Sequence, residues 1–175
     1  MVCVHHTPPF QAILGKIPGA FVVAPQAPAK PSMDDWNWRD HVTQLVQALA
    51  NHFPKRRMLA CGFSRGGLGV LQFLAAYPDA FDAWAAVDPQ PAGGGELDAI
   101  LRCPKLARGW LRYGKYRDRS PAWTGFADAL AKRIPPENRD TTDLDHPDIA
   151  LRAFSGDRLS ATSKRNLYEF LELEY

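Results

Sequence analysis

The sequence has few cysteines and no long apolar run. Only three of its 175 residues are cysteine, namely Cys3, Cys61 and Cys103, and they form no Cys-x-x-Cys motif. An odd set of thiols without that motif argues against a disulfide framework and favours reduced thiols in an intracellular protein. No apolar run approaches the roughly 20 residues that span a bilayer, and the first residues lack a signal-peptide pattern. We therefore expect a cytoplasmic protein without a membrane span.

An excess of charge of one sign is also lacking. The chain has 21 Lys and Arg against 19 Asp and Glu, so its formal net charge is +2. This balance gives no reason to expect nucleic acid or an anionic membrane as partner, and the basic cluster at 55–57 is predicted to be a solvated loop. His5 and His6 have no further ligand at a metal-binding spacing. The glycines at 93–95 lack a dinucleotide or phosphate-loop motif, so neither a metal nor a cofactor is expected.

Apolar runs and helical periodicities alternate along the rest of the chain. Short apolar runs predict strands at 20–25, 57–63, 83–87 and 107–114, the last near a sheet edge. Helices are predicted at 9–17, 38–53, 66–78, 121–134 and 160–173, with Ser163 as a possible cap of the last. This alternation indicates one α/β domain over residues 1–175, with a mainly parallel, doubly wound sheet flanked by helices.

The segment Cys-Gly-Phe-Ser-Arg-Gly-Gly at 61–67 follows one of these apolar runs and precedes a helical pattern. Gly-x-Ser-x-Gly at a strand-to-helix junction is typical of a nucleophile elbow, a tight turn that holds a serine hydroxyl out toward a substrate. Gly62 and Gly66 would allow close approach of neighbouring backbone, because a Cβ at either position is expected to clash. The pattern therefore predicts Ser64 as a nucleophile at the carboxyl end of a strand, where ligands of such sheets bind.

A serine nucleophile needs a base within hydrogen-bond reach and a third group that orients the base. Of five histidines, His146 in Asp-Leu-Asp-His-Pro is the favoured base because it follows the predicted strands. His5, His6, His41 and His52 are expected at the surface or at the chain end. The competing interpretation is that His146 is an ordinary loop histidine held by Asp145 or Asp148.

Two carboxylates compete for the third role. The chain order Ser, Asp or Glu, His restricts the acid to residues between Ser64 and His146. Asp118 follows the predicted strand at 107–114 and is favoured, while Asp88 follows the strand at 83–87 and remains the alternative. Asp118 could also be a surface or helix-capping carboxylate beside its arginine neighbours.

The segment from Phe21 through Cys-Gly-Phe-Ser-Arg-Gly-Gly to Val87 resembles the middle of an α/β-hydrolase of the carboxylesterase, lysophospholipase and depolymerase-like group. The stretch Leu-Asp-His-Pro-Asp-Ile-Ala at 144–150 is similar to the histidine-bearing end of bacterial members. The resemblance implies a serine hydrolase with Ser64 as nucleophile, His146 as base and Asp118 as acid. It departs from the family where Tyr113-Gly114 replaces the usual His-Gly.

A further departure lies at the start of the chain. Such hydrolases carry an upstream strand that ends in a His-Gly loop, and this loop donates one N–H to the oxyanion hole. Only Met-Val-Cys-Val-His-His at 1–6 could supply it. Either residues 2–4 form a short strand with His5 and His6 in place of the loop, or the chain lacks the first strands, and its length favours the second alternative. A missing strand would leave strand edges unpaired, which makes an oligomer possible.

Two hypotheses follow. In the first, the protein is an esterase that acts on a small-molecule carboxylic ester or thioester through an acyl-enzyme, with the backbone N–H of Arg65 in the oxyanion hole. In the second, it is a non-catalytic or truncated hydrolase-like domain that acts as a binding module, because the oxyanion loop is missing.

Overall fold

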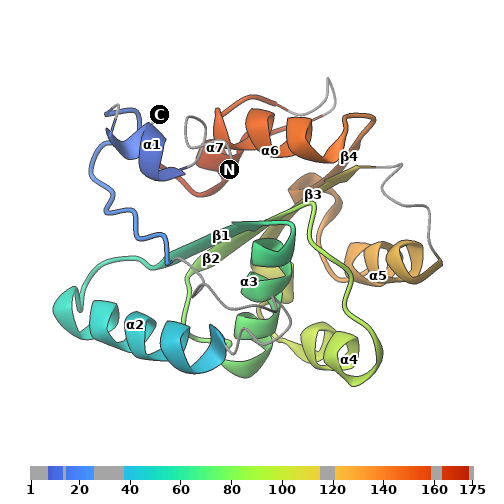
Figure 1. Cartoon of the computed structure of the whole chain (residues 1–175), viewed down its shortest axis with the longest axis horizontal. Helices are drawn as coiled ribbons and strands as arrows, with labels where there is room; N and C mark the ends of the chain where they lie inside the picture. The colour runs from blue at the N-terminus through green and yellow to red at the C-terminus, as the bar shows by residue number, and fades with distance from the viewer. Residues whose placement is uncertain (1–7, 14, 26–37, 115–120, 159–162, 174–175) are drawn as a thin grey trace, which may run out of the picture.

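The protein is built around a four-stranded sheet in which every neighbouring pair of strands is parallel (Figure 1). The computed structural model describes residues 8–13, 15–25, 38–114, 121–158 and 163–173. The strands lie in sequence order: β1 (Leu59–Phe63), β2 (Ala83–Val87), β3 (Gly109–Gly114) and β4 (Arg139–Thr142). The predicted α/β fold with a mainly parallel sheet is therefore confirmed.

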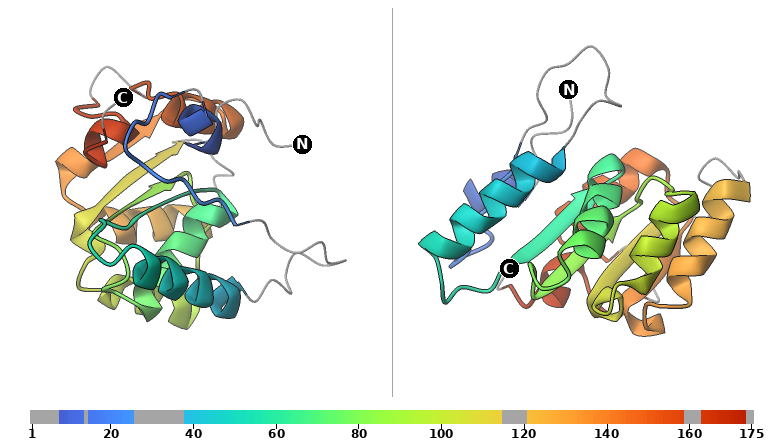
Figure 2. Two further views of the ribbon diagram at one scale, coloured as in Figure 1. Left: turned by 90° about the vertical axis from the view of Figure 1, so that its left-hand side faces the viewer. Right: turned by 90° about the horizontal axis from the view of Figure 1, so that it is seen from below.

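Helices cover both faces of this sheet (Figures 1 and 2). The connections between successive strands run through α3 (Arg65–Ala76), α4 (Gly94–Arg102) and α5 (Pro121–Ala131), which lie side by side on one face. The other face is covered by α6 (His146–Phe154) and α7 (Leu167–Phe170), with α1 (Pro8–Ile13) beside them.

Each face holds its own apolar cluster, and β2 contributes to both. Trp84 and Ala86 pack with α3, α4 and α5, whereas Ala85 and Val87 pack with α6 and α7. Side chains of a strand alternate between faces, so a strand covered on both sides is apolar throughout, as predicted for residues 83–87. The helix α5, which was predicted at 121–134, likewise buries an apolar face formed by Trp123, Phe126, Ala127 and Leu130.

One strand prediction is wrong. Residues 20–25 form no strand, and Phe21 is 78% exposed although its ring stacks on Phe53. A buried parallel strand needs a neighbour on the sheet, and β1 is the outermost strand of the described sheet. For the same reason Cys61 on β1 is exposed. The strand β3 lies between β2 and the edge strand β4, which fits the expectation of a strand near a sheet edge.

Three elements were not predicted from the sequence. The glycines at 93–95 obscured the start of α4, although Leu97, Ile100 and Leu101 have helical spacing. The strand β4 has only four residues, of which only Thr142 is buried, so its apolar signal is weak. The helix α6 begins at the candidate base itself, with Pro147 in its first turn.

The helix α7 is shorter than the predicted 160–173, and Ser163 is not its cap. Asn166 caps it, by accepting a hydrogen bond from the Glu169 N–H at 2.8 Å, while the Glu169 carboxylate accepts one from the Asn166 N–H at 2.9 Å. The Ser163 hydroxyl instead donates to Asp140 on β4. Leu167, Phe170 and Leu171 are buried.

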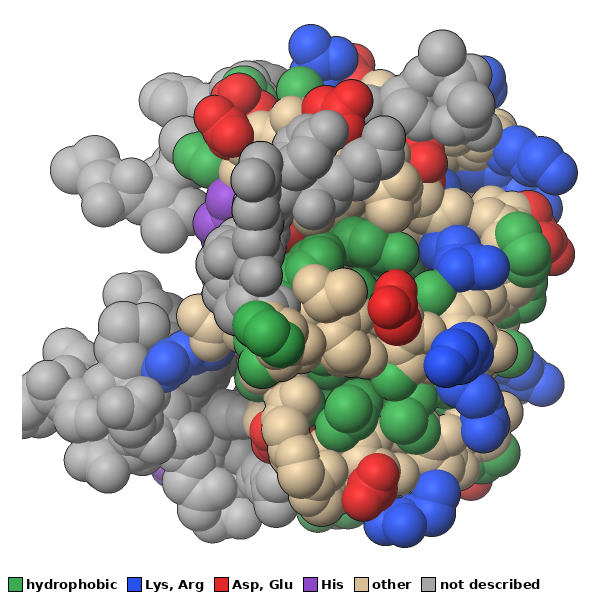
Figure 3. All heavy atoms as spheres, turned by 90° about the vertical axis from the view of Figure 1, so that its right-hand side faces the viewer, with side chains coloured by type: hydrophobic (Ala, Val, Ile, Leu, Met, Phe, Trp, Pro, Cys, Tyr) green, Lys and Arg blue, Asp and Glu red, His purple; other side chains and the backbone are tan. Residues whose placement is uncertain are grey.

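The predicted helix 38–53 is present as α2 (Trp38–His52), which ends before Pro54. Its apolar residues Val42, Leu45, Val46 and Leu49 are only partly buried. None of the helices in the described ranges is long and apolar enough to cross a membrane. On the face that Figure 3 shows, positive and negative side chains are interspersed, in keeping with the near-neutral net charge.

Candidate active site

Ser64 lies between β1 and α3 in a strained backbone conformation. Its φ is 55° and its ψ is −120°, a region that residues with a Cβ rarely adopt. Its N–H donates a hydrogen bond to the Val87 carbonyl at 3.0 Å, across the ends of β1 and β2. The serine is the N-cap residue of α3, but its side chain does not cap the helix. This turn is the strand-to-helix junction that the glycine and serine pattern predicts.

The glycines around Ser64 differ in how much space a Cβ would have. A Cβ at Gly62 would lie 2.2 Å from the carbonyl oxygen of Gly66, so only glycine fits there. At Gly66 a Cβ would meet no atom within 4 Å, so the prediction that it would clash is wrong. The second close approach is at Gly67, where a Cβ would lie 3.1 Å from the Cα of Pro89.

The loop after β2 is hydrogen-bonded to the turn at Ser64. The Gln90 N–H donates to the Ser64 carbonyl at 3.0 Å, and the Arg65 Nε donates to the Gln90 side-chain oxygen at 3.3 Å. The Leu68 N–H donates to the same Ser64 carbonyl at 3.1 Å. The Ser64 carbonyl therefore accepts one hydrogen bond from α3 and one from the loop after β2.

Asp88, the first residue after β2, is fully buried and also has a positive φ, of 43°. Its N–H donates to the Arg112 carbonyl at 2.6 Å, and its Oδ1 accepts a hydrogen bond from the Gly114 N–H at 3.1 Å. Its other oxygen, Oδ2, contacts Nδ1 of His146. The structure describes three non-glycine residues with positive φ, and two of them are Ser64 and Asp88. Residues with backbone strain of this kind are often found at functional sites.

His146 approaches the turn from the opposite face of the sheet. It is the first residue of α6, and its imidazole stacks on the Phe63 ring with 4.2 Å between ring centroids. Phe63 is the last residue of β1 and immediately precedes Ser64. The His146 side chain is 33% exposed, whereas the Asp88 side chain is 0% exposed. With Nδ1 turned to the buried carboxylate, Nε2 is the ring nitrogen left for a substrate or nucleophile.

Among the sequence-predicted residues, Ser64 and His146 thus lie at the same end of β1, with Arg65 opening α3. Asp118 falls in 115–120, outside the described residues, so its role stays a prediction. The carboxylate that contacts His146 in the described part of the chain is the alternative, Asp88. Asp145 is instead the N-cap residue of α6, and Asp148 lies in its first turn.

Sequence reasoning missed the roles of Phe63 and Gly114. Both are the last residues of their strands, and a strand end beside the nucleophile is the signal that could have identified them. No group of three or more His, Cys, Asp or Glu residues within the described ranges could hold a metal ion.

Comparison with known proteins gives one match. A protein-family model described as "Putative esterase" matches residues 19–141, which is more than half of the chain. The matched region includes Ser64 and Asp88, and it ends just before His146. No significant match was found among curated proteins or among solved structures.

Proposed function

Because the chain belongs to this esterase family of the α/β-hydrolase superfamily, we propose that it is a serine hydrolase of carboxylic esters or thioesters. In this proposal Ser64 is the nucleophile, His146 the general base and Asp88 the acid that orients it. The proposed substrate is a small molecule.

The observation that carries the proposal is the contact between His146 and Asp88 beside the strained turn of Ser64. A buried carboxylate on Nδ1 holds the imidazole in the tautomer whose Nε2 can accept a proton, and it stabilises the imidazolium that then forms. The Gly114 N–H fixes the other carboxylate oxygen. The Phe63 ring restrains the plane of the imidazole from one side.

The proposed reaction has two steps. In the first, Ser64 Oγ attacks the ester carbonyl while His146 Nε2 takes the hydroxyl proton, and collapse of the tetrahedral intermediate transfers that proton to the leaving alcohol or thiol. In the second, water attacks the acyl-enzyme with His146 again as base. Release of the carboxylic acid restores the Ser64 hydroxyl.

The amino terminus of α3 supports stabilisation of the negative oxygen formed in both steps. The Leu68 N–H donates to the Ser64 carbonyl, which places Arg65 in the first turn of α3, where the backbone N–H groups point out of the amino end of a helix. We propose the Arg65 N–H as an oxyanion donor, aided by the positive end of the helix dipole. Removal of one such donor costs about a hundred- to a thousandfold in rate.

The proposal replaces Asp118 by Asp88 as the orienting acid. Both residues satisfy the chain order of acid before histidine, and the contact with His146 favours Asp88. The two assignments predict different mutants to be inactive, so they can be separated by experiment.

The test is labelling with a fluorophosphonate probe together with hydrolysis of a small activated ester such as a p-nitrophenyl ester. The wild type should be labelled and should turn the ester over, whereas Ser64→Ala should lose both properties. His146→Ala should lose turnover, while His52→Ala is the matched control because His52 lies at the exposed end of α2. Circular dichroism checks that every variant is folded.

Equal turnover by wild type and Ser64→Ala would refute the proposed nucleophile. A folded wild type that neither reacts with the probe nor hydrolyses esters would favour the alternative, a hydrolase-like domain that binds small molecules without turnover.

A further inference from the structure

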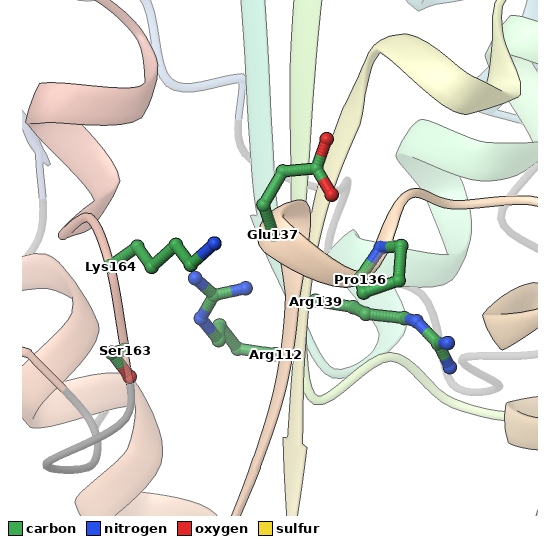
Figure 4. Close-up of a pocket in the computed structure, with 6 residues that line it drawn as sticks. All are labelled: Arg112, Pro136, Glu137, Arg139, Ser163 and Lys164. Carbon is green, nitrogen blue, oxygen red and sulfur yellow. The ribbon is translucent and has the colours of Figure 1, made fainter.

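A cavity lies at the β4 side of the sheet, whereas Ser64 follows β1 at the other edge. Its volume is about 140 Å³. It lies where β3 and β4 meet the 3₁₀ turn Pro136–Asn138 and the segment before α7 (Figure 4). The residues that line it are Arg112, Pro136, Glu137, Arg139, Ser163 and Lys164.

Arg112 is a buried cation in this cavity. The residue is 1% exposed, and its guanidinium carbon lies 3.9 Å from the centroid of the Trp110 ring. Its Nη1 donates to the Leu111 carbonyl at 3.0 Å, but its Nε has no hydrogen-bond partner among the described residues. Burial lowers the pKa of Arg112 to about 10, so the side chain still carries its charge at neutral pH. A buried charge with an unused donor is costly unless something compensates it.

Lys164 adds a second positive charge to the same cavity. Figure 4 shows its ammonium group and the Arg112 guanidinium pointing toward each other, while the side chains of Glu137 and Arg139 point elsewhere. The nearby Asp140 attracts Arg112, and its oxygens also accept hydrogen bonds from the Thr141 N–H and the Ser163 hydroxyl, so this carboxylate offsets at most one of the two positive charges. Two cations that face one cavity repel each other unless an anion lies between them.

We propose that this cavity binds a small tetrahedral oxyanion of the phosphate class, with Arg112 and Lys164 as its cationic ligands. The planar guanidinium offers N–H donors in a fork that fits a phosphate, and the flexible lysine supplies a point charge. Two cations match a doubly charged anion better than a singly charged carboxylate. Cavities of roughly 150 Å³ hold a benzene-sized molecule. This cavity, of about 140 Å³, therefore has room for a phosphate. This site is separate from the proposed ester hydrolysis.

The experiment is calorimetric titration of the full chain with inorganic phosphate, with chloride at equal ionic strength as the blank. We expect one phosphate to bind per chain, with acetate binding at least tenfold more weakly. Thermal denaturation should show a melting temperature that rises with phosphate, by about 3 °C or more at ten times the dissociation constant. Lys164 is exposed, so Lys164→Gln should fold normally and should bind phosphate at least tenfold more weakly.

Lys55→Gln is the matched control, because Lys55 is an exposed lysine that precedes β1 and does not line the cavity. It should bind phosphate as the wild type does, and Lys164→Arg should retain binding. Absence of saturable binding up to 50 mM phosphate, or equal binding by wild type and Lys164→Gln, would overturn the proposal. Ser64→Ala should bind phosphate normally, so loss of esterase activity and loss of this site are separate results.

Discussion

The carboxylate of Asp88 contacts Nδ1 of His146 and joins the end of β2 to the first residue of α6. The two residues are 58 positions apart in sequence, and both later crossovers of the sheet lie between them. Asp88 is itself held by hydrogen bonds to the Arg112 carbonyl and from the Gly114 N–H, both on β3. A buried carboxylate fixed in this way can set the tautomer of an imidazole that remains one-third exposed.

Replacement of Asp88 by asparagine tests this relationship. An asparagine amide fits the same space, but where its NH₂ faces His146 it favours the tautomer that carries the proton on Nε2, which cannot act as base. We expect kcat/KM for an activated ester to fall by about 10³- to 10⁴-fold in Asp88→Asn, with little change in KM. Steady-state kinetics on the folded variant give the measurement.

Asp118→Asn is the matched control for that experiment, since it makes the same chemical change at the other candidate. It should reduce kcat/KM less than about tenfold. The opposite pattern, with Asp118→Asn inactive and Asp88→Asn active, would return the acid role to Asp118.

The backbone strain at Ser64 gives a second prediction, which concerns the stability of two variants. Glycine adopts a φ of 55° without a Cβ penalty, whereas alanine keeps the penalty. Ser64→Gly should therefore be about 1 kcal/mol more stable than Ser64→Ala, even though glycine gains more entropy on unfolding. Both variants should fail to react with the fluorophosphonate probe.

Chemical denaturation of the two Ser64 variants under identical conditions measures this difference. If the alanine variant proved as stable as the glycine variant, the turn would not be strained in the manner described.

The proposed nucleophile and the proposed base each have a local signal in the sequence. Ser64 stands in a glycine pattern between an apolar run and a helical one, and His146 is a late histidine in a polar segment. Their roles stay predictions until tested, but the structure places both at the end of β1. The acid could not be chosen in this way, because Asp88 and Asp118 both follow predicted strands and only tertiary contacts distinguish them.

The strands were predictable where a segment has a clear apolar run, as at the outermost β1 and at the buried β2. The run Ala83–Val87 gave the exact bounds of β2, since all its side chains meet apolar neighbours. The run at 20–25 is as apolar but has no strand beside it in the described sheet. Edge strand β4 shows the converse, because Arg-Asp-Thr-Thr forms a strand through backbone pairing with β3 and has little apolar pattern.

The difference between Gly62 and Gly66 gives a third prediction. A Cβ at Gly62 would lie 2.2 Å from a backbone oxygen, so Gly62→Ala must displace the turn and should cost at least about 1–3 kcal/mol of folding free energy. Gly66 lies in α3 with open space around it, so Gly66→Ala should leave stability unchanged or raise it by up to about 1 kcal/mol. Urea unfolding measures both, and a large loss of stability in Gly66→Ala would contradict the geometry.

The capping box of α7 gives the last prediction. This helix has only four residues, too few to be stable by itself, yet it carries the buried Leu167, Tyr168 and Phe170. The Tyr168 hydroxyl donates to the Phe154 carbonyl at 2.7 Å, which ties α7 to the end of α6. The caps at Asn166 and Glu169 therefore support part of the core on that face of the sheet.

We expect Asn166→Ala to lower the free energy of unfolding by about 0.5–2 kcal/mol, because the Glu169 N–H loses its acceptor. Asn166→Ser keeps a side-chain oxygen that can cap the helix, so it should lose only a small part of that amount. Urea unfolding of the two variants beside the wild type gives both values. If serine were as costly as alanine, the contribution of Asn166 would come from packing and not from the cap.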